Sequence, residues 1–245
     1  MYNFLKKIAT SVIPKSFLFK NEVLFRKLFS FRYRGTTYTC NVCKTGLKKF
    51  IPIGKRDLLC PICGSRSRSR RLHHILESNH LLSGTILHFS PPRALYRLLK
   101  KNPTITYIAT DFENEFIADH SYDITNIDLP DNSIDVIICY HVLEHITEDA
   151  KAMTELYRIL KPKGTCLIQT PFKEGAIYED YSITTEEGRL KAFGQKDHVR
   201  IYSVEGLTNR LKVAKFNTEV IAFESVEKHN HGWLSEQVIK ATKKN

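Results

Sequence analysis

The sequence has no long apolar run, and this absence limits the kinds of protein it can encode. A transmembrane helix needs roughly 18 consecutive apolar residues, and no stretch of the 245 residues approaches that length. Internal repeats and low-complexity linkers are also missing, so we expect one ordinary domain with a small addition. The chain starts without a recognisable secretory signal peptide, which favours a cytoplasmic protein.

Acidic residues are almost absent from the first 71 positions. This part of the chain holds seventeen Lys and Arg residues but only two acids, Glu22 and Asp57. The remainder holds twenty basic and twenty-four acidic residues, so the whole excess of the net charge of +11 lies at the N-terminal end. We therefore expect this end to meet something acidic, such as phospholipid head groups, a phosphate-bearing substrate or nucleic acid.

Residues 1–34 form a basic arm rich in aromatic and aliphatic side chains. The pattern predicts two amphipathic helices, over 1–13 and 16–31, separated at Pro14. Helices of this composition bind membrane interfaces, which predicts peripheral contact of residues 1–34 with an anionic membrane at its cytoplasmic face. Two alternatives are that the helices pack on the catalytic domain, or that they form a mitochondrial presequence. Sparse Ser and an excess of Lys over Arg weaken the presequence hypothesis.

Cysteine is scarce, with six in the chain, yet four of the six form two Cys-x-x-Cys pairs separated by sixteen residues: Cys40, Cys43, Cys60 and Cys63. Two such turns joined by a hairpin give tetrahedral sulfur ligation, which suits zinc. The alternative is a pair of disulfides in a secreted protein. It is disfavoured by the start of the chain and by Cys139 and Cys166, which lie in apolar runs. We predict a zinc-ribbon-like module over 35–71. Four sulfur ligands leave no open position, so the chemistry must lie downstream.

Four arginines follow the second cysteine pair and precede an apolar helix expected over 72–82: Arg66, Arg68, Arg70 and Arg71. On one helix they spread around more than one face. We expect most of them to be solvated or paired with acids of the larger domain, and the alternative is that they bind phosphate.

From Gly84 onward, strand and helix patterns alternate as in an α/β domain with a parallel sheet. We expect strands over 85–89, 106–110, 133–140 and 165–170, a short strand near Asp123, and helices over 91–101 and 147–160. Ligands of such sheets bind at the carboxyl ends of the strands, near the point where strand order reverses. An acid that closes the second strand, Asp111, is placed to accept hydrogen bonds from ribose hydroxyls, and Asp123 from an adenine amine. Each signal is weak alone, but together they indicate an adenosine-containing cofactor.

The stretch from Asp123 to Ile146, with its Val-Leu-Glu-His run, and the Leu-Lys-Pro-Lys-Gly turn ending at Gly164 resemble class I S-adenosylmethionine-dependent methyltransferases. The resemblance is strong over residues 84–171. It implies a Rossmann-like sheet and cofactor contacts at Asp111, Phe112, Asp123, Ile124 and His141.

One departure from this family is large, because the first loop has no glycine and reads His88-Phe-Ser-Pro-Pro92. Glycine lets the backbone approach the methionine part of the cofactor. We expect Ser90 to take its place, with His88 and Pro91 also at the cofactor. The loop, the cysteine module and a Phe-Gly-Gln-x-Asp-His-Val-Arg segment together resemble a bacterial methyltransferase subgroup associated with cell-surface glycan biosynthesis. That resemblance spans residues 35–220. Loss of cofactor binding, leaving a non-catalytic binding protein, is the alternative.

The acceptor site is expected in an insertion at about 172–202, which is dense in polar and aromatic side chains. Transfer to oxygen requires a base, and we predict His198, with Asp197 as its orienter or as an alternative base. Predicted acceptor-binding residues are Tyr178, Asp180, Gln195 and Arg200. Arg200 would bind a phosphate or carboxylate. The alternative is a purely structural network of Asp197, His198 and Arg200. His145 is expected to cap or orient the following helix.

The sequence therefore predicts a zinc-containing, S-adenosylmethionine-dependent methyltransferase in the α/β class, with its methyltransferase domain over 72–245. We expect it to act on a saccharide, nucleotide-sugar or lipid-linked glycan intermediate. The second hypothesis is an RNA methyltransferase that uses the basic zinc module to bind RNA.

Overall fold

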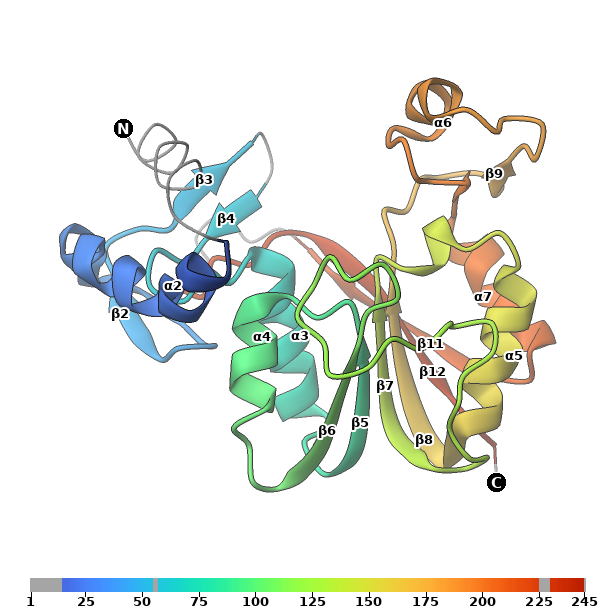
Figure 1. Ribbon diagram of the computed structural model, residues 1–245, viewed down its shortest axis with the longest axis horizontal. Helices are drawn as coiled ribbons and strands as arrows, with labels where there is room; N and C mark the ends of the chain where they lie inside the picture. The colour runs from blue at the N-terminus through green and yellow to red at the C-terminus, as the bar shows by residue number, and fades with distance from the viewer. Residues whose placement is uncertain (1–14, 55–56, 225–229, 245) are drawn as a thin grey trace. The chain divides into compact units, whose positions relative to one another are not determined.

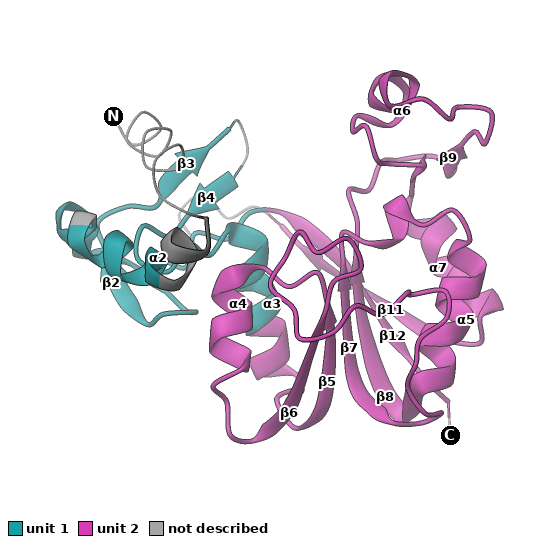
Figure 2. Ribbon diagram, in the orientation of Figure 1, with its two compact units in different colours: residues 1–73, 226–234 teal, residues 74–225, 235–245 magenta. Residues whose placement is uncertain are grey.

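Figure 1 shows the chain as a computed structural model, which describes residues 15–54, 57–224 and 230–244. The first predicted arm helix, over 1–13, lies outside the described residues. The chain divides into two compact units, coloured separately in Figure 2: unit 1 is residues 1–73 with 226–234, and unit 2 is residues 74–225 with 235–245. Among the helices that the structure describes, none has the length and hydropathy needed to cross a membrane.

Unit 1 contains a helix and two short hairpins. Helix α2 (Lys15–Phe29) is followed by the turn η1 (Phe31–Tyr33), which confirms the second predicted arm helix. Strand β1 (Arg34–Cys40) pairs antiparallel with β2 (Thr45–Leu47), and β3 (Ile51–Ile53) pairs with β4 (Asp57–Leu59). The β1–β2 hairpin therefore carries the first cysteine pair.

Two of the four arginines after the cysteine pairs are buried within unit 1, and for Arg70 the predicted solvated or acid-paired position is wrong. They lie on α3 (Ser67–Ser78), where Arg70 is 0% and Arg71 5% exposed. Arg70 donates hydrogen bonds to the backbone carbonyls of Ser65, Leu58 and Gly232 at 2.7 to 3.1 Å. A guanidinium has enough donors to serve several carbonyls at once, and the Ser65 carbonyl also accepts from the amide of Cys60. Arg70 is therefore not available as a phosphate ligand.

Unit 2 is built on a six-stranded sheet with the order β11-β12-β8-β7-β5-β6. Its strands are β5 (Gly84–Phe89), β6 (Ile105–Thr110), β7 (Ile134–Tyr140), β8 (Leu160–Gln169), β11 (Asn217–Phe223) and β12 (Glu236–Thr242). The first four are parallel to one another, as predicted. β6 and β7 flank β5 on opposite sides, so strand order reverses at the carboxyl end of β5.

The sheet differs from the prediction in two respects. It is mixed, because β12 runs antiparallel to β8 and β11 antiparallel to β12. The short strand expected near Asp123 is absent from the described sheet, and only an isolated bridge joins Asp123 to Asn126. The reason is local: the Asp123 carboxylate accepts hydrogen bonds from the amide and hydroxyl of Thr125, which fold the chain into a turn.

Helices cover both faces of the sheet, as Figure 1 shows for α4 on one side and for α5 and α7 on the other. Their bounds are α4 (Arg93–Leu99), α5 (Asp149–Ile159) and α7 (Val204–Val213). The main apolar core lies between the sheet and α5 with α7, and includes Met153, Leu156, Leu207 and Leu211, all fully buried. Each fully buried side chain of this size contributes roughly 1.5–3 kcal/mol relative to an exposed one. This core holds the strand ends in fixed register.

An insertion between β8 and α7 carries the short strands β9 (Tyr178–Glu179) and β10 (Arg200–Ile201) and the helix α6 (Glu186–Phe193). β9 and β10 pair antiparallel, with Arg200 opposite Glu179. The Thr185 hydroxyl caps α6 by accepting from the amide of Gly188, and Gly194 ends the helix in a left-handed conformation. Figure 1 shows the insertion beyond the end of the sheet where β8 finishes.

Candidate functional site

Three adjacent strands end in residues that the sequence assigned to the cofactor. Ser90 follows β5, Asp111 follows β6 and His141 follows β7. Ser90 and His141 have positive φ angles of 46° and 55°. A non-glycine residue adopts this left-handed conformation at a cost of about 1–2 kcal/mol, and such strain concentrates at functional sites. Ser90 therefore takes the backbone conformation that a glycine would give this loop.

Asp111 is 4% exposed, and its carboxylate already accepts three hydrogen bonds. The Ser90 hydroxyl donates to Oδ1 at 2.7 Å, while the amides of Glu115 and Phe116 donate to Oδ2 at 2.6 and 3.0 Å. A carboxylate accepts about four hydrogen bonds. Two ribose hydroxyls can therefore bind together only if at least one of these three donors leaves. The amide of Ser90 is also engaged, because it donates to the carbonyl of Thr110.

Other predicted cofactor residues lie beside these strand ends in different environments. Phe112 is 59% exposed and directly follows Asp111. Asp123 is exposed, with Oδ1 bound by Thr125, whereas Ile124 is buried in the main core. Pro91 is buried at the start of the loop after β5. An exposed ring next to a buried carboxylate provides a flat apolar surface at the same strand end.

The structure corrects the prediction for the His88 side chain. Its ring is completely buried, and burial lowers the pKa of His88 to about 3. Nδ1 lies 3.0 Å from the hydroxyl of Tyr107 on β6. Because successive residues of a strand face opposite sides of the sheet, the ring at position 88 points into the packed face and not beyond the strand end. His88 is a core residue, and its side chain does not contact a ligand at this site.

A second group of polar side chains lies just past β7. Glu144 and His145 belong to the turn η2 (Leu143–His145), and together with His198 they bring ligand atoms within 4.8 Å of one another. Glu144 Oε1 is 3.2 Å from His141 Nδ1, and Asp197 Oδ2 is 3.3 Å from His145 Nδ1. The rings of His145 and His198 meet edge to face at 4.7 Å. The predicted base, His198, is thus joined to the end of β7.

His198 itself is only 4% exposed. Burial lowers the pKa of His198, and the neighbouring His145 lowers it further. The Asp197 carboxylate contacts His145 and not His198. It therefore orients the two histidines through the ring of His145. His145 therefore takes part in the polar group and does not cap α5, whose N-cap position is Glu148.

Arg200 has a different role from the one predicted. Its side chain is fully buried, and it donates to Glu179 Oε2 at 2.9 Å and to the carbonyls of Leu143, Ile146 and Thr147. A guanidinium engaged in this way has no donor face left for a substrate phosphate or carboxylate. The prediction of Arg200 as an acceptor ligand is therefore wrong. Arg200 instead fixes the insertion to the turn that carries Glu144 and His145.

The remaining predicted acceptor residues lie on the exposed part of the insertion. Tyr178 is 48% exposed and packs its ring against Phe193 at 5.4 Å. Asp180 is exposed and accepts hydrogen bonds from the amide and hydroxyl of Ser182, while Gln195 is exposed in the loop after α6. Tyr181, which is not among the predicted acceptor ligands, is 60% exposed in the same insertion.

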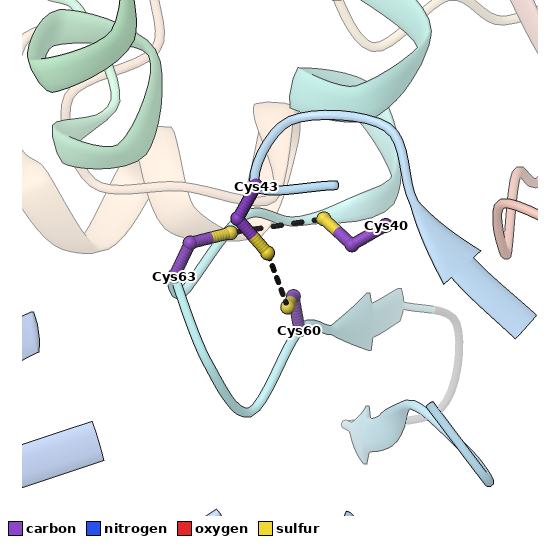
Figure 3. A group of neighbouring side chains, drawn as sticks. All are labelled: Cys40, Cys43, Cys60 and Cys63. Atoms are coloured by element: carbon purple, nitrogen blue, oxygen red, sulfur yellow. Dashed lines mark hydrogen bonds between the residues drawn. The ribbon is translucent and has the colours of Figure 1, made fainter. Parts of the chain in front are cut away.

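The four predicted metal ligands form one cluster in unit 1. Figure 3 shows their sulfur atoms turned toward a common centre, with Cys40 to Cys63 at 3.7 Å and Cys43 to Cys60 at 3.8 Å. A tetrahedral ion with metal–sulfur bonds of about 2.3 Å sets its sulfur atoms about 3.8 Å apart. The cysteines are free thiols, so the disulfide alternative is wrong. The geometry of the cluster fits a tetrahedral metal ion.

Local conformation shapes both cysteine turns. The residue after each pair, Lys44 and Gly64, has a positive φ angle of 56° and 77°. Such a residue turns the chain sharply, so that both thiols of a pair point to the same side. The crowding lowers the pKa of Cys40 far below its ordinary value, because Cys43 first and then Cys60 and Cys63 donate hydrogen bonds to its thiolate. The same contacts raise the pKa values of Cys60 and Cys63, so without an ion the cluster favours the thiolate at Cys40 and disfavours it at these two positions.

Glu144 is the functional candidate that the sequence interpretation missed. It lies in the Val-Leu-Glu-His run, which in the sequence served only as evidence of resemblance to class I methyltransferases. The signal was present, because His141, Glu144 and His145 share the spacing of one helical turn. The pairing with His198, more than fifty residues away, depends on the insertion and is not visible in the local sequence.

Comparison with protein families places these features in a class. Residues 92–168 match the family model described as a methyltransferase domain. The strand order, the reversal at β5 and the strand-end residues of unit 2 define a Rossmann-like class I methyltransferase fold, and the predicted fold class is confirmed. The family match and a curated relative support an S-adenosylmethionine-dependent methyltransferase.

That relative is a probable S-adenosylmethionine-dependent methyltransferase of Mycolicibacterium smegmatis, 32% identical over 99 residues, which are 39% of this chain and 34% of the relative. An uncharacterized protein of Methanocaldococcus jannaschii is 37% identical over 57 residues, or 23% of this chain and 25% of that protein. The chain thus spans about a third and a quarter of the lengths of these two relatives.

Two solved structures are similar in fold. A putative sarcosine dimethylglycine methyltransferase from Galdieria sulphuraria has a TM-score of 0.51 at 17% identity, covering 72% of this chain and 86% of that one. A methyltransferase from Archaeoglobus fulgidus has a TM-score of 0.50 at 15% identity, covering 71% and 93%. At these identities the similarity shows the fold alone.

Proposed function

We propose that this protein transfers a methyl group from S-adenosylmethionine to a hydroxyl of a saccharide, nucleotide-sugar or lipid-linked glycan intermediate. The observation that carries the proposal is the convergence of Ser90, Asp111 and His141 at three adjacent strand ends within a matched methyltransferase fold. Asp111 would bind the ribose, Phe112 would contact the adenine, and Asp123 its amine. Pro91, Ile124 and His141 would complete the cofactor contacts.

The acceptor class is inferred from the insertion. Exposed tyrosines next to carboxylate and amide groups suit a hydroxylated substrate, because aromatic faces pack against sugar C–H surfaces while the polar groups take the hydroxyls. Tyr178, Asp180 and Gln195 supply these groups, and Tyr181 adds a second exposed ring. The resemblance to glycan-associated methyltransferases points to the same class of acceptor.

Transfer requires the acceptor hydroxyl to lose its proton. The cofactor supplies an electrophilic methyl group on a sulfonium; the acceptor oxygen forms a bond to this carbon as the carbon–sulfur bond breaks, and sulfur keeps the electron pair. We propose that the acceptor proton leaves at the group formed by Glu144, His145 and His198, with Asp197 holding His145. Such assistance is typically worth about 10²- to 10⁴-fold in rate. His198→Ala should lower turnover by that order while cofactor affinity stays close to wild type.

We further propose that the four cysteines hold a structural zinc ion. Sulfur separations of 3.7 and 3.8 Å support this assignment, and four protein ligands leave no position for substrate. Zinc here would stabilise unit 1 and take no part in methyl transfer.

Peripheral membrane binding is proposed for the N-terminal arm. Leu24 and Leu28 lie one turn apart on α2 and are 56% and 59% exposed, and Phe31 in the following turn η1 is 63% exposed. Lys27 and Arg32 lie among them. An exposed apolar row flanked by cations suits an anionic lipid surface at the cytoplasmic face of a membrane.

The basic excess of the first 71 residues also favours RNA as a second candidate acceptor. One experiment separates the candidates. Purified protein is incubated with methyl-labelled S-adenosylmethionine and, in separate reactions, the nucleotide-sugar pool, the lipid-linked glycans and total RNA of the source cells. We expect label in a glycan fraction, and none when His198→Ala replaces the wild type. Label in RNA alone would establish the second candidate. No label in any fraction, with no binding of cofactor, would leave a non-catalytic protein.

A further inference from the structure

Glu144 has a carboxylate oxygen that its protein surroundings do not satisfy. The residue is 1% exposed, and Oε1 lies 3.2 Å from His141 Nδ1. The other oxygen, Oε2, is buried without a hydrogen-bond partner in the part of the chain that the structure describes. Burying such an oxygen unpaired costs free energy, so each instance in a native structure requires an explanation, and a bound cation is one.

The side chains next to Glu144 are histidines, which commonly bind metal ions in proteins. Glu144, His145 and His198 each offer an atom within 4.8 Å of the other two. Ligand atoms about 2.1 Å from a common tetrahedral ion lie about 3.4 Å apart, so small side-chain adjustments would suffice. Two imidazoles and one carboxylate suit zinc and neighbouring transition metals, whereas magnesium and calcium prefer oxygen ligands alone.

The ligands are held in place by the surrounding chain. Asp197 Oδ2 lies 3.3 Å from His145 Nδ1, so the proton of that ring is directed to the carboxylate and Nε2 keeps its lone pair for an ion. The amide of Val199 donates to the carbonyl of Glu144, which ties the two ligand segments together. Arg200 donates to the carbonyls on both sides of the turn, as described above. These contacts fix the backbone of all three ligands.

We propose that Glu144, His145 and His198 form a binding site for a divalent transition metal, separate from the four-cysteine cluster. Three protein ligands leave open positions, as in catalytic zinc sites. An acceptor hydroxyl bound at an open position would lose its proton at a lower pH, and the ion would stabilise the resulting alkoxide. Vicinal sugar hydroxyls could fill two positions at once. This catalytic role rests on the proposed function, but binding of the ion does not.

The test is metal content of the full-length protein. Wild-type protein and variants are equilibrated by dialysis with micromolar zinc, and the bound metal is counted by mass spectrometry with neither cofactor nor acceptor present. We expect two ions per wild-type chain and one in His198→Ala and Glu144→Gln. His120→Ala, which removes an exposed histidine of unit 2, should retain two. His198→Gln has a side chain of similar size and controls for loss of the ion through misfolding. This variant should bind one ion and keep the wild-type melting temperature.

A positioning variant adds a graded readout. Asp197→Ala should keep two ions at high zinc but bind the second about 10- to 100-fold more weakly, as expected when the partner of a ligating histidine is removed. One ion in the wild type, or two in folded His198→Ala, would overturn the site. Two ions without methyl transfer would refute the proposed function and leave the site standing. One ion with active transfer would make His198 a direct base.

Discussion

Ser90 and His141 adopt, at the ends of β5 and β7, the positive φ angles that glycine usually supplies. Each non-glycine residue held at positive φ costs about 1–2 kcal/mol, so the surrounding contacts must over-determine the conformation. The amide of Ser90 donates to Thr110 and that of His141 donates to Gln169, each at 2.8 Å across to the neighbouring strand. The strand ends are therefore fixed before any ligand arrives. This explains how a loop without glycine can still present a cofactor site.

Arg200 supports the insertion, and its replacement should act on stability. Arg200→Met removes a fully buried cation and leaves Glu179 Oε2 and three carbonyls without their donor, while Glu179 Oε1 keeps its hydrogen bond from Arg210. Breaking a buried charge pair on one side typically costs about 3–5 kcal/mol. We expect urea denaturation to show a loss of this size. Lys191→Met, which removes an exposed cation from α6, should cost less than about 0.5 kcal/mol. Equal stability of the two variants would refute the role of Arg200.

Glu155 contributes to the stability of the folded protein in a pH-dependent way. The hydrogen bond from Arg158 lowers the pKa of Glu155 below its ordinary value of 4.5, and the amide of Ile127 assists. The ionised form is thus favoured in the folded state, so the stabilisation is complete above pH 4.5 and is lost as the pH falls through the lower folded pKa.

Glu155→Gln should therefore destabilise the protein by about 1 kcal/mol at pH 7 and by progressively less toward pH 3. Urea denaturation across this range measures the difference. The exposed control Glu187→Gln should show little difference at any pH. A cost for Glu155→Gln that stays constant with pH would contradict the assignment.

Elements with strong local signals were predictable, and those that depend on distant partners were not. The alternating strand and helix patterns located β5, β6 and β7 and the helix α5. The strand expected near Asp123 failed because a side chain of that residue folds its own backbone into a turn. Arg70 was misjudged because its carbonyl partners include Gly232, which is remote in sequence. For the same reason, the sequence suggested His198 without showing that Glu144 lies beside it.

The two hairpins of unit 1 should depend on the cysteine cluster. Cys60→Ser should abolish zinc binding and unfold these elements, since structural zinc of this kind contributes on the order of 10 kcal/mol. Trp233 is the single tryptophan, is 8% exposed and belongs to unit 1, so its fluorescence reports on this unit selectively. We expect a red-shifted emission with most of the far-ultraviolet circular dichroism retained. Cys139→Ala, in β7, should keep both zinc and emission. Zinc-free wild-type protein with native fluorescence would refute the dependence.

Helix α2 offers a separate prediction about membranes. Leu24→Glu with Leu28→Glu should reduce sedimentation with anionic vesicles several-fold, because it replaces the apolar row with charges that repel the lipid. Val213→Glu with Val220→Glu introduces the same charge at exposed positions of unit 2 and is the matched control. If both double variants sediment alike, the arm does not bind lipid through this row.

Across the whole molecule, the charge is divided between regions with different proposed tasks. The first 71 residues carry a net +15 and the rest a net −4. Long-range attraction to an anionic surface therefore acts on the N-terminal region, whereas the strand-end residues of the cofactor site belong to unit 2. This division predicts that salt weakens surface binding without a comparable effect on cofactor affinity.

The central claim is that unit 2 binds S-adenosylmethionine at the ends of β5, β6 and β7. Isothermal calorimetry of the full-length protein with S-adenosylhomocysteine tests it most directly. The account predicts one site per chain, with affinity reduced about 10- to 100-fold in Asp111→Ala, as expected for hydrogen bonds to a charged group. Asp128→Ala, which removes an exposed acid of unit 2, should bind as the wild type does. Absence of binding heat and of any thermal stabilisation in the wild type at millimolar ligand would contradict the claim.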